Sequence, residues 1–254
     1  SLFLVGLALL YGVVGTLSMA DLAAKLPLVP ETDRGLLHAG AAILAVAFLT
    51  KAAIWPLNFW LVPAYTATSA PVAALFALMT KVGIYVLLRS STLLFSADAG
   101  HSTHFGAPVF LYGGLVTVIF GVIGLVASLR VGRIAAFSII VSAGTLLAAI
   151  GVGSTSVTSA ALFYLVSATL SASALFLLVE LLERIGRRGD RVSLSDVEMA
   201  QDDDTNLDED QLPLVGRVIP VDLALLGLAF IACALLIAGL PPLSGFVAKF
   251  ELMR

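Results

Sequence analysis

The chain has 254 residues, of which 59% are hydrophobic and only 12% are charged, and its mean hydropathy is +1.05. A soluble domain must keep its surface wet, so this composition excludes one and predicts an integral membrane protein. Nucleic acid is excluded as a partner because no basic patch is interleaved with aromatic residues. The net charge of −3 arises mostly from acids gathered in one segment.

Redox chemistry is disfavoured by the same sequence. The single cysteine, Cys233, lies in an apolar run and has no second thiol to pair with. No ligand set for haem or an iron–sulfur cluster is visible, so we predict neither a metal nor another cofactor. Because the sequence begins at Ser1, inside a hydrophobic segment and without an initiator methionine, we expect it to be an excerpt of a longer membrane protein.

Seven apolar stretches follow one another along the chain. Each is near or above the roughly 20 residues that cross about 30 Å of hydrocarbon as a helix. We therefore predict an all-α, polytopic transmembrane bundle of about seven helices. The stretches comprise residues 2–19, 36–61, 71–89, 109–129, 134–152, 160–182 and 221–240. The predicted division is a six-helix core at 1–184, an acidic cytoplasmic linker at 185–220 and a broken transmembrane helix at 221–254.

The second stretch carries a charge and a proline. Lys51 would cost about 3 kcal/mol or more at mid-bilayer, so an ionisable residue there indicates a functional site. Pro56 lacks an N–H and clashes with the carbonyl of Ala52, so we expect the helix to kink or open there. Broken backbone at membrane depth requires a covering of protein or a water-filled cavity, and a buried ammonium needs such a cavity too.

The third stretch carries Lys81 ten residues after Pro71, which suits the first turn of a helix. Ten helical residues rise about 15 Å, which places Lys81 near mid-bilayer. The loop after this stretch contains Asp98, His101 and His104. A metal site there is disfavoured, because an exposed HxxH pair lacks i,i+4 spacing and a third ligand. We interpret the loop as solvated.

Small and hydroxyl residues mark the fourth and sixth stretches. Glycines in the fourth favour close helix packing in lipid. A face of hydroxyl residues in the sixth either lines a hydrated path or joins helices, and both interpretations stay open. Glu180 and Glu183, with Arg184, close the sixth stretch, and we expect ion pairing at this helix end. The small and hydroxyl residues are Gly113, Gly114, Gly121, Gly124, Ser167, Thr169, Ser171 and Ser173.

The last stretch must end where Pro241 and Pro242 stop a regular helix, and Gly245 then permits a turn. Lys249 follows shortly afterwards. Periodicity alone leaves this lysine either inside the membrane or just beyond it, because residues 223–240 already cover about 27 Å as straight helix. In the linker before this stretch, the acidic run at 202–210 is typical of a disordered, solvated segment.

The charges of the loops predict the orientation. The side that carries the turns after the second, fourth and sixth stretches holds most of the arginines, and the positive-inside rule places this side in the cytoplasm. The arginines are Arg130, Arg133, Arg184, Arg187, Arg188, Arg191 and Arg217, against Lys25, Arg34 and Arg89 on the opposite side.

Four segments together carry a family resemblance. They read YGVVGTLSMADLA at 11–23, KAAIWPLNFWLVPAY with APVAALFALMTKVGIYVLLR at 51–89, LFYLVSATLSASALFLL at 162–178 and GLPPLSGFVAKFEL at 239–252. They resemble the antiporter-like subunits of proton- and cation-translocating membrane complexes. Within that family the chain is most similar to the D subunit of the multisubunit (Mrp-type) Na+/H+ antiporters, with the proton-pumping subunits of respiratory complex I as the runner-up.

The resemblance implies a fold of about 14 helices built from two inverted repeats, each with a broken helix. It matches Lys51 to the lysine of the first broken helix, Lys81 to that of the next helix and Lys249 to that beside the second break. In the family these lysines form a hydrated proton path along the membrane midplane. A glutamate pairs with the first of them, and we expect that acid upstream of Ser1.

Two departures from the family pattern concern titration. Many relatives carry histidine at the positions of Asn58 and Ser167, and neither asparagine nor serine titrates. Their amide and hydroxyl groups, with that of Thr169, are able to hold water in line instead. A dipole argument adds an asymmetry: Lys51 near the C-terminal end of a half helix would keep its charge, whereas Lys249 near the N-terminal end of another would not.

The predicted function is ion movement rather than enzymatic chemistry. We expect a subunit of a monovalent cation/proton antiporter in the bacterial inner membrane, whose partners are other antiporter subunits, protons, Na+ or K+, and the lipid bilayer. One alternative is a proton-translocating membrane subunit of a complex I-type NADH:quinone oxidoreductase. Another is a structural scaffold subunit without its own ion path, for which neutralising the lysines leaves transport intact.

Overall fold

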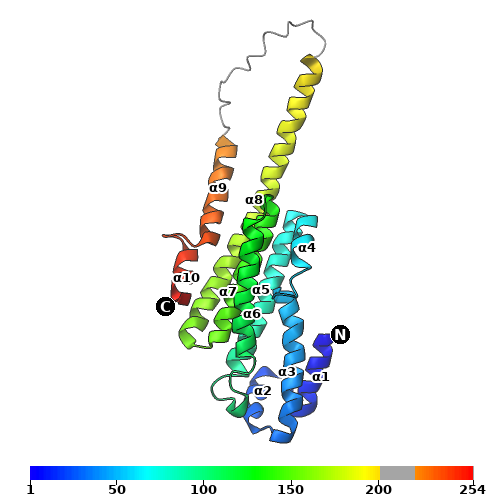
Figure 1. Ribbon diagram of the computed structural model, residues 1–254, viewed down its shortest axis with the longest axis vertical. Coiled ribbons are helices and arrows are strands. Elements are labelled where there is room, and N and C mark those ends of the chain that lie inside the picture. The colour runs from blue at the N-terminus through cyan, green and yellow to red at the C-terminus, as the bar shows by residue number, and fades with distance from the viewer. Residues whose placement is uncertain (201–220, 254) are drawn as a thin grey trace.

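The computed structural model describes residues 1–200 and 221–253, and this described part is a bundle of helices (Figure 1). The predicted all-α class is therefore confirmed. In chain order the elements are α1 (Leu2–Val14), α2 (Met19–Lys25), η1 (Leu26–Leu28), α3 (Glu31–Ala52), α4 (Leu61–Ala67), α5 (Ala70–Leu93), η2 (Gly100–Ser102), α6 (Ala107–Val126), α7 (Val131–Val152), α8 (Thr155–Ala200), α9 (Val221–Ala238) and α10 (Ser244–Met253).

Five helical segments in the described part are long and apolar enough to cross a membrane. They are α3, α5, α6 with the preceding turn η2, α7, and α8 as far as Leu182. α1 and the α2–η1 segment form a pair bent by 51°, and α9 is a shorter apolar helix. The first predicted stretch ends early, because Gly15 adopts φ 75° and caps α1 at Val14.

α7 lies at the centre of the packing. Its apolar window is 67% buried, against at most 44% for the other four spans. The glycines of α6 let α7 approach closely: a Cβ on Gly114 would lie 2.4 Å from the amide nitrogen of Ala148, and one on Gly124 would lie 2.1 Å from the ring of Phe137. Gly121 also faces α7, at Val141, whereas a Cβ on Gly113 would lie 2.6 Å from Ile54 in the segment after α3. The packing role predicted for the four glycines is confirmed.

The second predicted span is interrupted rather than kinked. α3 ends at Ala52, Ala53 adopts a left-handed conformation with φ 58°, and helix resumes only at Leu61 in α4. Pro56 lies within this break, four residues beyond the end of α3. The helix ends before the proline ring can meet a helical carbonyl, so the expected clash with Ala52 does not arise. α4 also occupies most of the segment between the second and third predicted stretches.

A second interruption separates α9 from α10 and contains Pro241 and Pro242. Gly239 directly after α9 adopts φ 75°. A Cβ on Gly245 would lie 1.9 Å from the carbonyl oxygen of Leu236, so glycine is required where α10 passes the end of α9. The two short helices α4 and α10 thus each follow a break in the chain.

α8 continues past the membrane-crossing window as far as Ala200 (Figure 1). Residues 185–200 of the predicted linker are therefore helical. The acidic run at 202–210 lies outside the described residues. The division into core, linker and broken helix stays a prediction.

The loop between α5 and α6 is only partly solvated. His38 of α3 places Nε2 3.0 Å from Oγ of the buried Ser102 and stacks on Phe105 with ring centroids 4.3 Å apart. These contacts attach the loop to α3, whereas His101 and His104 are exposed. The interpretation as a solvated loop is therefore right for the two histidines and wrong for the segment around Ser102.

Candidate functional site

Lys81 is a buried cationic side chain, only 1% exposed. α5 carries it into the bundle, where Nζ donates a hydrogen bond to Oγ of Ser142 on α7. Ser142 Oγ in turn donates to the carbonyl oxygen of Ile139 at 2.9 Å. A charge removed from water costs several kcal/mol unless it finds such partners. The α5–α7 contact therefore holds an ionisable group at the centre of the bundle.

Lys249 of α10 is half-buried and reaches the end of the preceding helix. Its Nζ donates to the carbonyl oxygens of Ile237 at 2.8 Å and Ala238 at 3.0 Å. The last carbonyls of a helix have no intrahelical partner, so the break after α9 supplies acceptors for an ammonium. Gly239 adopts φ 75°, which favours glycine, and a Cβ there would lie 2.8 Å from Cδ of Lys249, so the lysine side chain passes close to this turn.

This geometry corrects the dipole argument made for Lys249. The sequence hypothesis placed the lysine near the positive, N-terminal end of a half helix. The structure places its Nζ at the C-terminal end of α9, the negative pole, which attracts a cation. Lys51 also lies in the last turn of its helix, α3. Both lysines therefore lie at the C-terminal end of a helix, so the helix dipoles do not supply the contrast predicted between them.

A small cavity, lined by both hydroxyl and apolar residues, lies between the partners of Lys81 and Lys249. Ser142, the acceptor for Lys81, forms part of its wall, and so does Ile237, an acceptor for Lys249. The space open to a water centre is ≈ 10 Å³, about the minimum that one water molecule needs. The other lining residues are Ser138, Tyr164, Ser167, Ala168, Ala172 and Leu236.

Lys51 is placed differently from the other two lysines. Its side chain is exposed on the surface of the described chain, whereas Lys81 is buried and Lys249 is half-buried. It lies where α3 crosses α5: a Cβ on Gly83 would stand 3.3 Å from Cβ of Lys51. The structure thus brings an acceptor for Lys81 and an acceptor for Lys249 to one cavity, and it leaves Lys51 beside the helix that carries Lys81.

The break after Lys51 is held by side chains. Trp60 Nε1 donates to the carbonyl oxygen of Thr50 at 3.0 Å, and the amide of Trp55 donates to Thr117 Oγ1 of α6 at 2.9 Å. Asn58 is only 4% exposed, and its Nδ2 has no hydrogen-bond partner among the described residues. Because buried donors are normally paired, this amide group is available to a water molecule within the break.

The hydroxyl residues of α8 do not form one face. Ser167 Oγ lies 3.2 Å from Ser244 Oγ of α10 and lines the cavity, whereas Ser173 Oγ donates to the carbonyl oxygen of Ala74 on α5. Thr169 Oγ1 donates to its own helix, at the carbonyl of Leu165. The expectation of a single face is wrong, because residues two apart on an α-helix point about 200° apart.

Comparison with known proteins decides the family. The family model described as NADH:quinone oxidoreductase/Mrp antiporter, TM, matches residues 1–254. The chain belongs to this family. The resemblance inferred from the four sequence segments is therefore confirmed.

Two curated relatives are named as antiporter subunits of the D type. The chain is 51% identical over 253 residues to the probable K(+)/H(+) antiporter D subunit of Rhizobium meliloti (strain 1021), covering 100% of this chain and 46% of the relative. It is 36% identical over 256 residues to the Na(+)/H(+) antiporter D subunit of Bacillus subtilis (strain 168), covering 99% of this chain and 46% of the relative. The chain thus spans about half the length of these family members.

Two solved structures share the fold. The Mrp complex from Dietzia sp. DQ12-45-1b matches with a TM-score of 0.74 and 25% identity, over 99% of this chain and 41% of that chain. The membrane-bound sulfane sulfur reductase, an archaeal respiratory membrane complex, matches with a TM-score of 0.77 and 22% identity, over 99% of this chain and 46% of that chain. At that lower identity, the second likeness concerns the fold alone.

Sequence reasoning missed the serines of α7. Ser138 and Ser142 both line the cavity, and Ser142 is the partner of Lys81. The signal was present, since two serines four residues apart in an apolar stretch lie on the same face of a helix. Small hydroxyl residues are common in membrane helices, however, and the spacing alone does not name the lysine that they meet.

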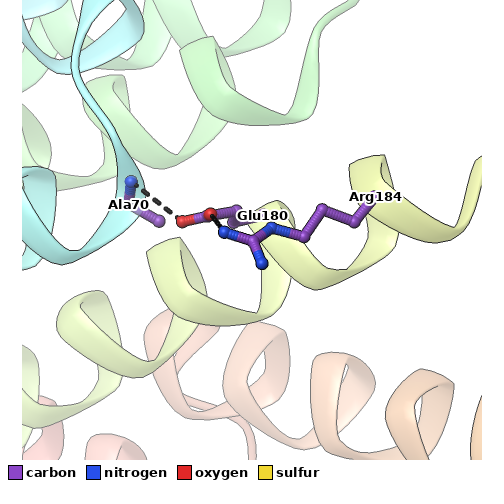
Figure 2. Close-up of polar contacts among 3 residues, drawn as sticks. All are labelled: Ala70, Glu180 and Arg184. Atoms are coloured by element: carbon purple, nitrogen blue, oxygen red, sulfur yellow. Dashed lines mark hydrogen bonds and ion pairs between the residues drawn. The ribbon is translucent and has the colours of Figure 1, made fainter. Parts of the chain in front are cut away.

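Glu180 has a role that sequence reasoning found only in part (Figure 2). Its predicted ion pair with Arg184 is confirmed. Its other oxygen, Oε2, accepts a hydrogen bond from the backbone amide of Ala70 at 3.1 Å. The first N–H groups of a helix lack intrahelical partners and attract negative charge. Glu180 of α8 therefore caps α5, the helix that carries Lys81.

Proposed function

We propose that this chain is the lysine-bearing part of a D-type subunit in a monovalent cation/proton antiporter, and that it moves protons along Lys51, Lys81 and Lys249. The observation that carries the proposal is the cavity whose wall contains an acceptor for Lys81 and an acceptor for Lys249. An ionisable residue inside a membrane segment is expensive, and three of them in one family-matched chain favour an ion path.

The proposed path uses hydroxyl groups and water. A proton leaving Lys81 passes to Ser142 Oγ, whose own proton turns from the carbonyl of Ile139 to a water in the cavity. That water carries it toward Lys249. Ser167 of α8 provides a further hydroxyl in the wall of the cavity, and its Oγ contacts Ser244 Oγ of α10. Asn58 holds water in the break after Lys51. Thr169, which is bonded to its own helix, is left out of the proposed path.

The proposal also covers the exchanged ion, the partner subunits and the membrane in which the protein lies. The relatives are named as K(+)/H(+) and Na(+)/H(+) antiporter subunits, so the exchanged ion is K+ or Na+ and the partners are further antiporter subunits. An acid that is not among the described residues pairs with the exposed Lys51. The protein lies in the bacterial plasma membrane, with the arginine-rich turns on the cytoplasmic side.

The relatives' names favour this proposal over a subunit of a complex I-type NADH:quinone oxidoreductase. A direct test reconstitutes the full complex in vesicles that carry an imposed proton gradient. We expect Na+ or K+ to collapse the gradient with wild-type protein and to leave it intact with Lys51→Ala, provided that assembly is confirmed by size-exclusion chromatography. NADH-dependent quinone reduction by the purified complex, without cation-dependent collapse, would overturn the proposal.

A further inference from the structure

A second and larger cavity opens near the start of α5, away from the cavity between the lysines. It lies among the end of α4, the first turns of α5 and α7, and α8, and its volume is ≈ 520 Å³. One part of its wall is apolar and aromatic, formed by Tyr65, Ala73, Phe176 and Val179. This cavity plays no part in the proposed proton path.

The rim of the cavity is basic. Arg130 and Arg133, at the start of α7, are both exposed and line it. The acid in the lining, Glu180, is already engaged by the amide of Ala70 and by Arg184 (Figure 2). The two arginines of the rim therefore outweigh a carboxylate that has its own partners, and the rim favours an anion.

A hydroxyl group inside the cavity also lacks a partner. Thr68 lines the cavity, and its Oγ1 is buried without a hydrogen bond to any described residue. Most buried polar atoms are paired, so an unpaired hydroxyl beside two arginines indicates a place for an acceptor oxygen. Arginine recognises phosphate oxygens through its planar fork of N–H donors.

The position of the cavity relative to the membrane limits what can fill it. It lies at the first residues of the spans Ala70–Leu93 and Val131–Val152 and near the end of the span Thr155–Leu182. Three ends of membrane-crossing segments therefore surround it, which places it at the level of lipid headgroups. Its basic rim and apolar wall together match an amphiphile rather than a small ion.

We propose that this cavity binds an anionic phospholipid, with the phosphate on Arg130 and Arg133 and the glycerol and upper acyl chain against the apolar wall. Basic pockets between membrane helices are a known setting for acidic headgroups, and a free phosphate would leave the apolar wall unused. The bound lipid links the start of α7 to the junction of α4 and α5. This binding is independent of the proposed transport and is measured without it.

The test uses the full complex in detergent, titrated with phosphatidylglycerol or phosphatidylcholine and observed by native mass spectrometry. We expect wild type to bind phosphatidylglycerol more tightly than phosphatidylcholine. Arg130→Ala/Arg133→Ala should weaken phosphatidylglycerol binding tenfold or more, as expected when charge-assisted hydrogen bonds are lost. Arg89→Ala, which removes a positive charge at the other end of α5, is the matched control and should bind as wild type does.

A second variant keeps the proposal testable if the double variant does not assemble. Thr68→Val removes the unpaired hydroxyl at nearly constant volume and should weaken phosphatidylglycerol binding several-fold, about what one hydrogen bond contributes. Equal binding of both lipids by wild type would overturn the proposal, as would unchanged binding by the assembled variants. Displacement of the lipid by inorganic phosphate would also overturn it, in favour of a free-anion site.

Discussion

Lys81 pairs with a neutral hydroxyl rather than with a carboxylate among the described residues. A serine hydroxyl accepts a hydrogen bond from an ammonium and donates one to a neutral amine. The contact with Ser142 can therefore persist in both protonation states of Lys81. A carboxylate partner would favour only the charged state, and a relay needs a lysine that releases its proton.

Ser142→Ala tests this contact. The substitution leaves a buried ammonium without its hydroxyl partner, which costs about 1–3 kcal/mol, so we expect cation-dependent proton transport to fall roughly tenfold. The measurement is the rate of gradient collapse in vesicles that contain the full complex. Ser90→Ala is the matched control, because Ser90 Oγ donates only to its own helix at the carbonyl of Val86. Equal rates for the two variants would show that the hydroxyl is dispensable.

At the scale of single residues, the sequence predicts the lysines that are unfavourable in a membrane better than it predicts their hydrogen-bond partners. Lys51 and Lys81 stand out because a charge in an apolar stretch has a large energetic cost. Ser142 does not stand out, because a serine costs little in a helix and its role depends on how α5 and α7 pack. The direction of the Lys249 side chain was missed for the same reason, since it depends on the fold of the break before α10.

The two interruptions between helices leave backbone and side-chain polar groups without a partner in a helix. The break after α9 leaves the carbonyl oxygens that receive Lys249, and the break after α3 contains the unpaired amide of Asn58. Prolines in the sequence predict that the chain is interrupted in these two places. They do not give the length of an interruption, because the left-handed turn at Ala53 ends α3 before Pro56 is reached.

The α6–α7 contact yields a stability prediction. A Cβ on Gly114 would lie 2.4 Å from a backbone nitrogen of α7, so the helices must separate in Gly114→Ala. We expect a loss of about 1–3 kcal/mol in the free energy of unfolding, the usual cost of overpacking, seen as a lower melting temperature of the purified complex. In Gly35→Ala the new Cβ meets nothing within 4 Å, so this control should melt as wild type does or slightly higher.

The hydrogen bond from Ala70 to Glu180, which caps α5, yields a second stability prediction. Glu180→Ala removes the carboxylate that accepts from the amide of Ala70, and loss of a helix cap costs about 1 kcal/mol. Arg184→Ala removes only the partner in an exposed i,i+4 pair, for which about 0.5 kcal/mol or less is expected. Thermal unfolding of the two variants should therefore rank Glu180→Ala as the less stable. The reverse order would contradict the capping role.

At the scale of the whole molecule, the described helices bring Ser142, the acceptor for Lys81, and Ile237, an acceptor for Lys249, to one cavity. They leave Lys51 at the surface. The chain spans about half the length of its curated relatives. The apolar stretches were predictable because each must cross the bilayer. Their packing was not, because apolar faces in lipid carry little information about which helices meet.

The relay through Lys81 is tested most directly by Lys81→Arg in the full complex reconstituted in vesicles. Arginine keeps the positive charge but does not give up its proton. With assembly verified by size-exclusion chromatography, the account predicts that Na+ and K+ no longer collapse an imposed proton gradient, as in Lys81→Ala. Collapse at the wild-type rate in assembled Lys81→Arg would contradict the relay.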